Sequence, residues 1–262
     1  MFRFDGKRAL VVGAATGMGA ATAQTVARLG GEVIALDVAP IDYAAKQAVR
    51  VDLSQLASVD AALAQVGGPL DAVFLCAGVA DGNPHLMKIN FISQRYLLEK
   101  SIERGALPRG AAVAWISSVA GMGWQANLPA LKEFSAIADW QAAVAWIASH
   151  ANTNTYVFSK QAMNFYTAQQ AFPLLKRGIR INAIEPGPTD TPLARANADV
   201  WLRFGSNYRA DAGVETLRPQ QMADVLAFLC SPAASGISGI SLLVDQGLMS
   251  SSIAGSFTKP PM

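Results

Sequence analysis

The stretch RALVVGAATGMGAATAQTVARLGGEVIALD, residues 8–37, contains the pattern that decides the fold. An apolar run is followed by Gly13, Gly17 and Gly19, by a helical pattern of small residues, and by a second β-branched run. Glycines in these places let the backbone turn tightly and approach a pyrophosphate, whose charge would face the N-terminus of the helix. The stretch therefore predicts a strand–turn–helix–strand unit that binds a dinucleotide. Tight packing of the helix on the sheet is the alternative explanation of the glycines.

Asp37 adds a second feature, because it ends the second predicted strand 20 residues after Gly17. A carboxylate there accepts hydrogen bonds from the ribose hydroxyls of an adenosine. It would repel the 2′-phosphate of NADP, and no Arg or Lys occupies positions 14, 15 or 38. Two like charges at ~4 Å cost about 4 kcal/mol at an effective dielectric of about 20, a preference of up to about a thousandfold. We expect NAD as the cofactor, the alternative being that Asp37 is a simple turn residue.

The alternation of strands and helices continues along the chain. Strands are expected at 8–13, 31–37, 48–52, 71–78, 111–117, 178–184 and 240–245, and helices at 17–29, 54–66 (with Ser54 as N-cap), 86–104, 156–176 and 219–230. Several strands are apolar throughout, which is typical of strands covered on both faces. This order predicts an α/β protein: a single-domain Rossmann fold with a seven-stranded parallel doubly wound sheet and helices on both faces. The last residues, 250–262, look like a loose tail.

The composition limits the possible partners. A chain of 262 residues with 15% charged residues and a net charge of +2 fits one large domain with oligomer contacts, so a homodimer or homotetramer is expected. Scattered basic residues predict no nucleic-acid partner. The opening resembles a signal peptide, but its glycine spacing favours the phosphate turn. The apolar segment 134–150 is too short and too interrupted to span a bilayer. We therefore expect a cytoplasmic protein with no membrane partner.

Cysteine and histidine are rare. Cys76 and Cys230 lie in apolar stretches, which favours buried reduced thiols, although a disulfide stays open. His85 and His150 have no cysteine cluster and no metal-ligand spacing around them. We predict no metal site and expect His150 to lie at the surface.

A candidate proton-transfer pair lies in NTNTYVFSKQAMNFY, residues 152–166. Tyr156 and Lys160 are four positions apart at the start of a predicted helix, so their side chains share one face. Lowering the phenol pKa from about 10 to about 7 takes about 4 kcal/mol. One ammonium at ~4 Å supplies an energy of that order in a partly buried site. The pair is predicted to be a catalytic acid/base with its activating cation; an exposed helix pair is the alternative.

Together, these features resemble the short-chain dehydrogenase/reductase family over nearly the whole chain. GAATGMG (13–19) resembles its cofactor turn, VDL (51–53) its adenine contact, LCAG (75–78) the strand that supports the cofactor, and EPGPTDTP (185–192) the loop that holds the nicotinamide. The resemblance implies a set of cofactor contacts. They are Gly13, Thr16, Gly17, Met18, Gly19, Asp37, Asp52, Leu53, Ala77, Gly78, Tyr156, Lys160, Pro186, Gly187, Thr189 and Thr191.

The resemblance also implies catalytic roles. Ser118 in ISSVAG (116–121) matches the serine that holds the substrate oxygen and stabilises charge developing on it. Asn90 in KINFIS (88–93) matches the asparagine that positions a proton-relaying water. Tyr156 and Lys160 complete the set, with Lys160 also donating to the nicotinamide ribose. The alternatives are that Ser118 is a turn residue and Asn90 a polar residue inside a helix.

The chain departs from the family pattern in four places. Val12, Cys76 and VDQG (244–247) replace a threonine, an asparagine and a DGG motif, and these changes are expected to alter packing. Ser118 and Tyr156 are 38 residues apart, about three times the gap in most relatives. The extra residues, about 124–152, carry helical periodicity and Trp124, Trp140 and Trp146. A similar insertion occurs in the bacterial 3α-hydroxysteroid dehydrogenase/carbonyl reductase branch. We expect it to alter or cover one interface through which relatives assemble.

The segment of about 192–218 corresponds to the part of the family that closes over the substrate. Its Trp201, Phe204 and Tyr208 either do so or belong to core or subunit contacts. If they do, they favour a bulky apolar substrate such as a steroid. The resemblance thus implies NAD(H)-dependent interconversion of a secondary alcohol and a ketone. The alternatives are an NADPH-dependent carbonyl or 3-oxoacyl reductase, which Asp37 disfavours, and a non-catalytic dinucleotide sensor, which would not need the serine, tyrosine and lysine together.

Overall fold

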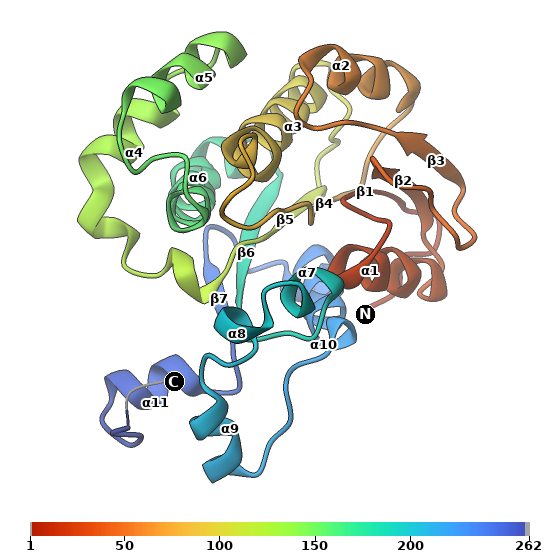
Figure 1. Cartoon of the computed structure of the whole chain (residues 1–262). Helices are drawn as coiled ribbons and strands as arrows, with labels where there is room; N and C mark the ends of the chain where they lie inside the picture. Colours follow the sequence, from red (N-terminus) through yellow and green to blue (C-terminus); the bar gives the residue numbers. More distant parts are fainter. Residues whose placement is uncertain (1, 260–262) are drawn as a thin grey trace.

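A parallel sheet of seven strands forms the centre of the protein, of which the computed structural model describes residues 2–259 (Figure 1). The strands lie in the order β3-β2-β1-β4-β5-β6-β7, and every neighbouring pair is parallel. They are β1 (Arg8–Val12), β2 (Glu32–Asp37), β3 (Gln47–Arg50), β4 (Ala72–Leu75), β5 (Ala112–Ile116), β6 (Arg180–Pro186) and β7 (Ser241–Val244). The predicted seven-stranded Rossmann fold is confirmed.

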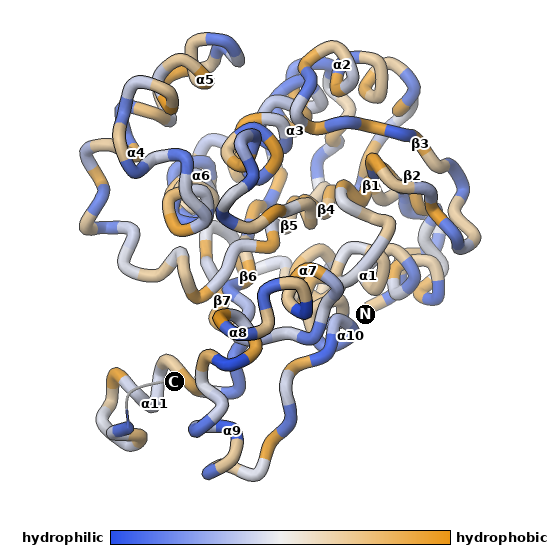
Figure 2. Tube along the Cα trace, viewed as in Figure 1, coloured by the Kyte–Doolittle hydropathy of each residue, from blue (hydrophilic) through white to orange (hydrophobic). Residues whose placement is uncertain are grey.

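Two helical layers cover the sheet, because successive residues of a strand point to opposite faces. Leu10 and Val12 of β1 pack in the core that includes α2, α3 and α6, whereas Ala9 and Val11 pack in the core that includes α1 and α10. These helices are α1 (Gly17–Arg28), α2 (Leu56–Gln65), α3 (Ser93–Glu103), α6 (Tyr156–Lys176) and α10 (Pro219–Cys230). The central strands are largely apolar (Figure 2), as expected for strands buried on both faces.

The strand order reverses beside β1, where the chain runs outward to β3 and then returns to β4 on the other side. Such a reversal leaves a crevice at the carboxyl ends of the strands, where ligands bind in open α/β sheets. β1, β2 and β4 end there at Val12, Asp37 and Leu75. The fold thus brings the glycine turn, Asp37 and residues 76–81 to one edge of the sheet.

Two predicted helices differ in detail. Ser54 is not the N-cap of α2, which begins one residue after Gln55; the backbone N–H and the hydroxyl of Ser54 both donate to Asp52 Oδ1 instead. The predicted helix 86–104 is divided into a π-helix, η1 (Lys88–Ile92), and α3. Single π-turns of this kind often occur at functional sites, and this one contains Asn90.

The segment 124–152 is helical, as its periodicity predicts. It holds the short turn η3 (Trp124–Asn127), α4 (Leu128–Ser135) and α5 (Trp140–Ser149), whose start is capped by Asp139 (Figure 1). Phe134 and Trp146 stack with each other and with Phe158 of α6, at ring-centroid distances of 5.1 to 6.1 Å. Replacing buried aromatics of this size by alanine costs about 3–5 kcal/mol. The segment therefore covers the first half of α6 as part of the same core.

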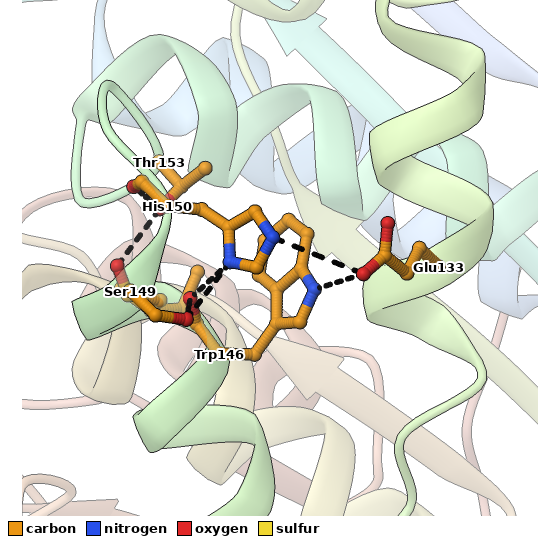
Figure 3. Close-up of polar contacts among 6 residues, drawn as sticks. Glu133, Trp146, Ser149, His150 and Thr153 are labelled. Atoms are coloured by element: carbon orange, nitrogen blue, oxygen red, sulfur yellow. Dashed lines mark hydrogen bonds and ion pairs between the residues drawn. The ribbon is translucent and has the colours of Figure 1, made fainter.

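The end of α5 is fastened by polar contacts around one tryptophan (Figure 3). The ring of His150 stacks on Trp146 at 3.9 Å between centroids, and Trp146 Nε1 donates to Glu133 Oε1 at 2.8 Å. Thr153 Oγ1 donates to the carbonyl of His150 at 2.6 Å. His150 lies at the surface, as predicted, with 41% of its side chain exposed.

The last third of the chain adds four short helices to α10. They are α7 (Pro192–Arg195), α8 (Ala198–Trp201), α9 (Ser206–Ala212) and α11 (Leu248–Ile253). The predicted loose tail, 250–262, is wrong for its first part, which belongs to α11. Phe257 packs edge-on against Tyr208 of α9, with 5.1 Å between the ring centroids. Residues 260–262 lie outside the described residues.

Two further predictions concern the whole chain. Cys76 and Cys230 are free thiols, as predicted. Within residues 2–259, no helix has the length and hydropathy needed to cross a bilayer.

Candidate active site

A cavity of about 640 Å³ lies at the carboxyl ends of the strands. Its wall contains every predicted site residue except Asn90. They are Gly13, Thr16, Gly17, Met18, Gly19, Asp37, Asp52, Leu53, Ala77, Gly78, Ser118, Tyr156, Lys160, Pro186, Gly187, Thr189 and Thr191. Residues from seven separate chain segments thus meet around one space.

The glycine turn is fixed by close backbone contacts. Gly13 has φ +79°, and a Cβ on it would lie 2.5 Å from backbone atoms of Ala77. A Cβ on Gly19 would lie 1.9 Å from the carbonyl oxygen of Gly13. Thr16, the N-cap of α1, makes no side-chain cap bond, so the first backbone N–H groups of α1 remain available to an anion.

A tyrosine stabilises this turn in a way that the sequence did not indicate. Tyr43 Oη donates to the carbonyl oxygen of Ala14 at 2.7 Å from the loop between β2 and β3. Gly13 N and Ala14 N both donate to Leu36 O, at 2.8 and 3.1 Å. These bonds hold the turn although Val12 lacks the hydroxyl that the family pattern has there.

Asp37 is tied to the glycine turn at the far end of the cavity. Its Oδ2 accepts from Ala15 N at 2.8 Å, and its Oδ1 accepts from Ala39 N at 3.0 Å. Each carboxylate oxygen retains a lone pair for a hydroxyl donor. Asp52 is similarly held by Ser54, which lowers the pKa of Asp52. This end of the cavity is therefore acidic and rigid.

Tyr156, Ser118 and Lys160 meet at the other end. Ser118 follows β5, and its Oγ accepts from Ala120 N at 3.1 Å. Tyr156 and Lys160 open α6; Lys160 Nζ lies 5.2 Å from the centre of the Tyr156 ring and donates to Ile116 O at 2.8 Å. Ser118 lies close enough to the Tyr156 side chain to oppose the rise in the pKa of the phenol. The fold thus brings together a hydroxyl, a phenol and an amine from residues up to 42 positions apart.

Burial controls the protonation of this group. It raises the pKa of Tyr156 to about 12, with the Asp81 charge adding to the rise and the Ser118 hydrogen bond opposing it. Burial also lowers the pKa of Lys160 to about 7. The expectation that the Lys160 ammonium brings the phenol pKa near 7 is wrong, because burial raises the pKa of Tyr156 and lowers the pKa of Lys160.

Asn90 lies just behind the cavity wall and is fully buried. Its Oδ1 accepts from Val79 N at 2.8 Å, and its Nδ2 donates to Val79 O and to Ser159 Oγ, both at 3.1 Å. A Cβ on Gly78 would lie 3.8 Å from Asn90 Oδ1 and 3.9 Å from Lys160 Nζ. Asn90 Oδ1 and Lys160 Nζ therefore both lie near Gly78, and the role of Asn90 in holding a water stays a prediction.

The loop after β6 closes the cavity opposite the glycine turn. Thr191 Oγ1 accepts from Ala194 N at 3.0 Å and caps α7, and Thr189 Oγ1 donates to Gly187 O at 2.9 Å. A Cβ on Gly17 would lie 3.5 Å from the Thr191 side chain, so α7 begins beside α1 (Figure 1). The loop and the first turn of α1 face each other at a fixed spacing.

Three functional candidates escaped the sequence analysis. Asp81 lines the cavity beside Tyr156, and Val157 and Met249 line its outer part. No motif marks these positions, because they reach the cavity only through the fold. Trp201 and Phe204 were named beforehand and do line the cavity, with the Trp201 ring 4.7 Å from the Tyr156 ring; Tyr208 instead contacts the tail.

The residues present fit a nicotinamide dinucleotide. Uncapped N–H groups at the start of α1 suit a pyrophosphate, and the Asp37 carboxylate suits ribose hydroxyls. These two features lie in one cavity with the Tyr156 group. A dinucleotide bound between them would place its two ends at the acidic end and at the catalytic end.

The chain is similar to several dehydrogenases of known activity. It is 30% identical over 252 residues to coniferyl-alcohol dehydrogenase of Pseudomonas sp. (strain HR199 / DSM 7063), covering 93% of this chain and 97% of the relative. It is 31% identical to cis-4-hydroxycyclohexanecarboxylate dehydrogenase of Sinomonas cyclohexanicum, covering 93% and 97%. It is 27% identical to 3-alpha-hydroxysteroid dehydrogenase/carbonyl reductase of Comamonas testosteroni, covering 91% and 95%. The predicted resemblance to that last branch is confirmed.

A solved structure and a family model also match this chain. The crystal structure of 3-alpha-hydroxysteroid dehydrogenase from Pseudomonas sp. B-0831, complexed with NADH, matches with a TM-score of 0.76 at 26% identity, covering 96% of this chain and all of that one. A family model described as enoyl-(acyl carrier protein) reductase matches residues 13–249. The chain therefore belongs to the short-chain dehydrogenase/reductase family and is an oxidoreductase.

Proposed function

We propose that this protein interconverts a secondary alcohol and a ketone with NAD(H) as cofactor, on a bulky, apolar substrate such as a steroid. One observation carries the proposal: Ser118, Tyr156 and Lys160 meet in the same cavity as Asp37. A protein that only senses a dinucleotide has no need of the first three. An enzyme specific for NADP has no need of a carboxylate at the ribose position.

The cavity residues supply the proton chemistry. Because the pKa of Tyr156 is about 12, its phenol is protonated at neutral pH and suited to donate a proton to the oxygen of a ketone. Ser118 would donate a hydrogen bond to the same oxygen and stabilise its developing charge. In the direction of alcohol oxidation, Tyr156 must act as a base, and this requires a positive charge nearby. Lys160 supplies part of that charge when protonated.

NAD(H) would be held by the start of α1, by Asp37 and by the loop of Pro186, Gly187, Thr189 and Thr191. Its nicotinamide would supply the hydride donor or acceptor, and its oxidised form would add positive charge beside Tyr156. Lys160 Nζ and Asn90 Oδ1 both lie within 4 Å of the position that a Cβ on Gly78 would take, and a water held between them would carry a proton away from Tyr156. The relatives act on the alcohols in their names, and the NADH of the solved structure supports the cofactor choice.

The outer part of the cavity supports an apolar substrate. Val157, Val200, Trp201, Phe204 and Met249 line it. Val157 and Val200 are 47% and 70% exposed, which is unusual for valine unless a ligand or partner covers it. A ring system of a substrate would bury this surface.

The test measures NADH formation from NAD across a panel of cyclic and steroid secondary alcohols, with NADP in parallel. We expect turnover with NAD, and a loss of about a hundredfold or more in kcat for Ser118→Ala. Ser149→Ala, at the exposed end of α5, is the matched control and should behave as wild type. Better activity with NADP would contradict the cofactor assignment. Tight NAD binding without turnover on any alcohol would favour a sensor.

We also propose that the protein assembles as a homodimer or homotetramer. α4 and α5 cover the first half of α6, while Phe172 and Leu175 in its second half are 72% and 53% exposed. Light scattering at micromolar concentration should give a multiple of 27.6 kDa. A monomer would contradict the proposal.

A further inference from the structure

Asp81 is held at a defined place beside the catalytic group. It follows β4 in the loop 76–82, is exposed to solvent and lines the cavity. Its Oδ1 accepts from the backbone N–H of Tyr156 at 2.7 Å. That N–H belongs to the first residue of α6 and has no partner within the helix. One hydrogen bond therefore both satisfies the start of α6 and fixes a carboxylate next to Tyr156.

The charges around the cavity are unevenly placed. Among the described residues of its wall, the charged ones are Asp37, Asp52, Asp81 and Lys160. Asp37 and Asp52 follow β2 and β3 and belong to the end expected to hold the adenosine. Lys160 is 3% exposed, and its amine is bound to Ile116 O. The solvent-accessible charge of the substrate end is thus the negative charge of Asp81.

Among the described residues of the cavity wall, no exposed cation would offset the repulsion between Asp81 and an anionic substrate. Besides Ser118, Tyr156 and the buried Lys160, apolar side chains form this end of the cavity wall, including Val157, Val200, Trp201 and Phe204. A carboxylate within about 5 Å of Asp81 is repelled at an effective dielectric of about 20. Even when screening by salt is allowed for, this repulsion lowers the affinity for an anionic substrate by about tenfold or more.

We propose that Asp81 is a specificity-determining residue that excludes alcohols carrying a carboxylate and restricts the site to neutral or cationic ones. This rests on the proposed function, because it assumes that the substrate lies beside Tyr156. It sets this protein apart from its relative that is named for cis-4-hydroxycyclohexanecarboxylate. The apolar side chains of the cavity wall offer contact surface to an apolar ring. The Asp81 carboxylate determines which charge a substituent on that ring can carry.

The test compares wild type with Asp81→Asn, which keeps an oxygen for the N–H of Tyr156 and removes the charge. The ligands are cis-4-hydroxycyclohexanecarboxylate and its methyl ester, and their binding to the NADH-loaded protein is followed by calorimetry. Wild type should prefer the ester, and Asp81→Asn should reduce that preference about tenfold. Asp60→Asn, on exposed α2 outside the cavity, removes the same charge and should leave the preference as in wild type.

Salt separates a charge effect from a structural one. Raising the ionic strength should weaken the ester preference of wild type and leave that of Asp81→Asn unchanged. An equal preference in wild type and Asp81→Asn, or no measurable binding of either ligand, would overturn the proposal. Turnover of both compounds by the same enzymes is measured separately. A charge-dependent binding preference without any turnover would overturn the proposed function and leave the role of Asp81 standing.

Discussion

The two ends of one cavity are built in different ways. The adenosine end, which is the end proposed to hold the adenosine, consists of the glycine turn after β1, Asp37 at the end of β2 and Asp52 two residues after β3. The substrate end includes Asp81, Val157, Val200, Trp201, Phe204 and Met249, which come from two loops and three helices. Backbone contacts fix the first end, whereas side chains form the second. A change at the first end should therefore act through backbone geometry and charge, and a change at the second through lost contact area.

The largest effect on cofactor binding is expected from Gly19→Ala at the adenosine end. A Cβ there would lie 1.9 Å from the carbonyl oxygen of Gly13, so the turn must shift. Since the phosphate contacts depend on this backbone, NAD affinity should fall at least a hundredfold in a calorimetric titration. Gly236→Ala, which meets nothing within 4 Å, is the matched control. Unchanged affinity in Gly19→Ala would show that the turn does not hold the phosphates.

Next in size is the loss of cofactor preference in Asp37→Asn. Removing the charge that would repel a 2′-phosphate should reduce the ratio of NAD to NADP affinity by about a hundredfold. The comparison of the two dissociation constants under identical salt measures this directly. A ratio that stays as in wild type would mean that another group selects the cofactor.

At the substrate end, Trp201→Ala should have a smaller and different effect. The Trp201 ring lies 4.7 Å from the Tyr156 ring and lines the cavity, so its removal takes away area that a substrate would bury. We expect KM for an apolar alcohol to rise about tenfold while the dissociation constant of NAD stays within about twofold. A rise in the dissociation constant of NAD as large as the rise in KM would contradict the division of the cavity into two ends.

The last effect concerns the free energy of unfolding and not the binding of a ligand. Burial raises the pKa of Glu185 to about 7; Asn164 of α6 donates to its Oε1, and the charge of Asp245 adds to the rise. A carboxyl whose pKa is raised on folding contributes stability below its unfolded pKa and loses it as pH rises through about 7. Glu185→Gln should therefore gain about 2 kcal/mol relative to wild type between pH ~5 and pH ~8, measured by urea unfolding at each pH. A constant difference between the two proteins would show that Glu185 does not titrate in this range.

The contrast between a turn built from local backbone contacts and a site built from distant side chains also explains what the sequence could predict. Residues 8–37 specify the turn through local spacing, and α6 and α10 begin and end where their patterns predict. Ser54 failed as a cap because its donors are taken by Asp52, two residues away. The π-turn at Asn90 depends on bonds to Val79 in a separate loop. Asp81 and Tyr43 act through contacts 75 and 29 residues apart, which no local pattern encodes.

The sequence predicted which residues form the catalytic group, but not the direction in which the fold shifts the Tyr156 pKa. Spacing brings Tyr156 and Lys160 together, but it does not report how deeply they are buried. Burial raises the pKa of Tyr156, opposite to the expected direction, and it lowers the pKa of Lys160, which is 3% exposed. Burial is a property of the whole fold, including α8 and its Trp201, which covers the Tyr156 ring.

The most direct test of the account measures binding and chemistry in the same variant, Tyr156→Phe. Its NAD affinity should stay within about threefold of wild type, because phosphate and adenosine contacts lie at the other end of the cavity. Its turnover of the preferred alcohol should fall by about a thousandfold or more, because the phenyl ring left at position 156 has no proton to exchange with the substrate oxygen. Tyr96→Phe, which removes a phenol bonded to Asp60 on the surface, serves as control. Turnover of Tyr156→Phe close to that of wild type would contradict the account.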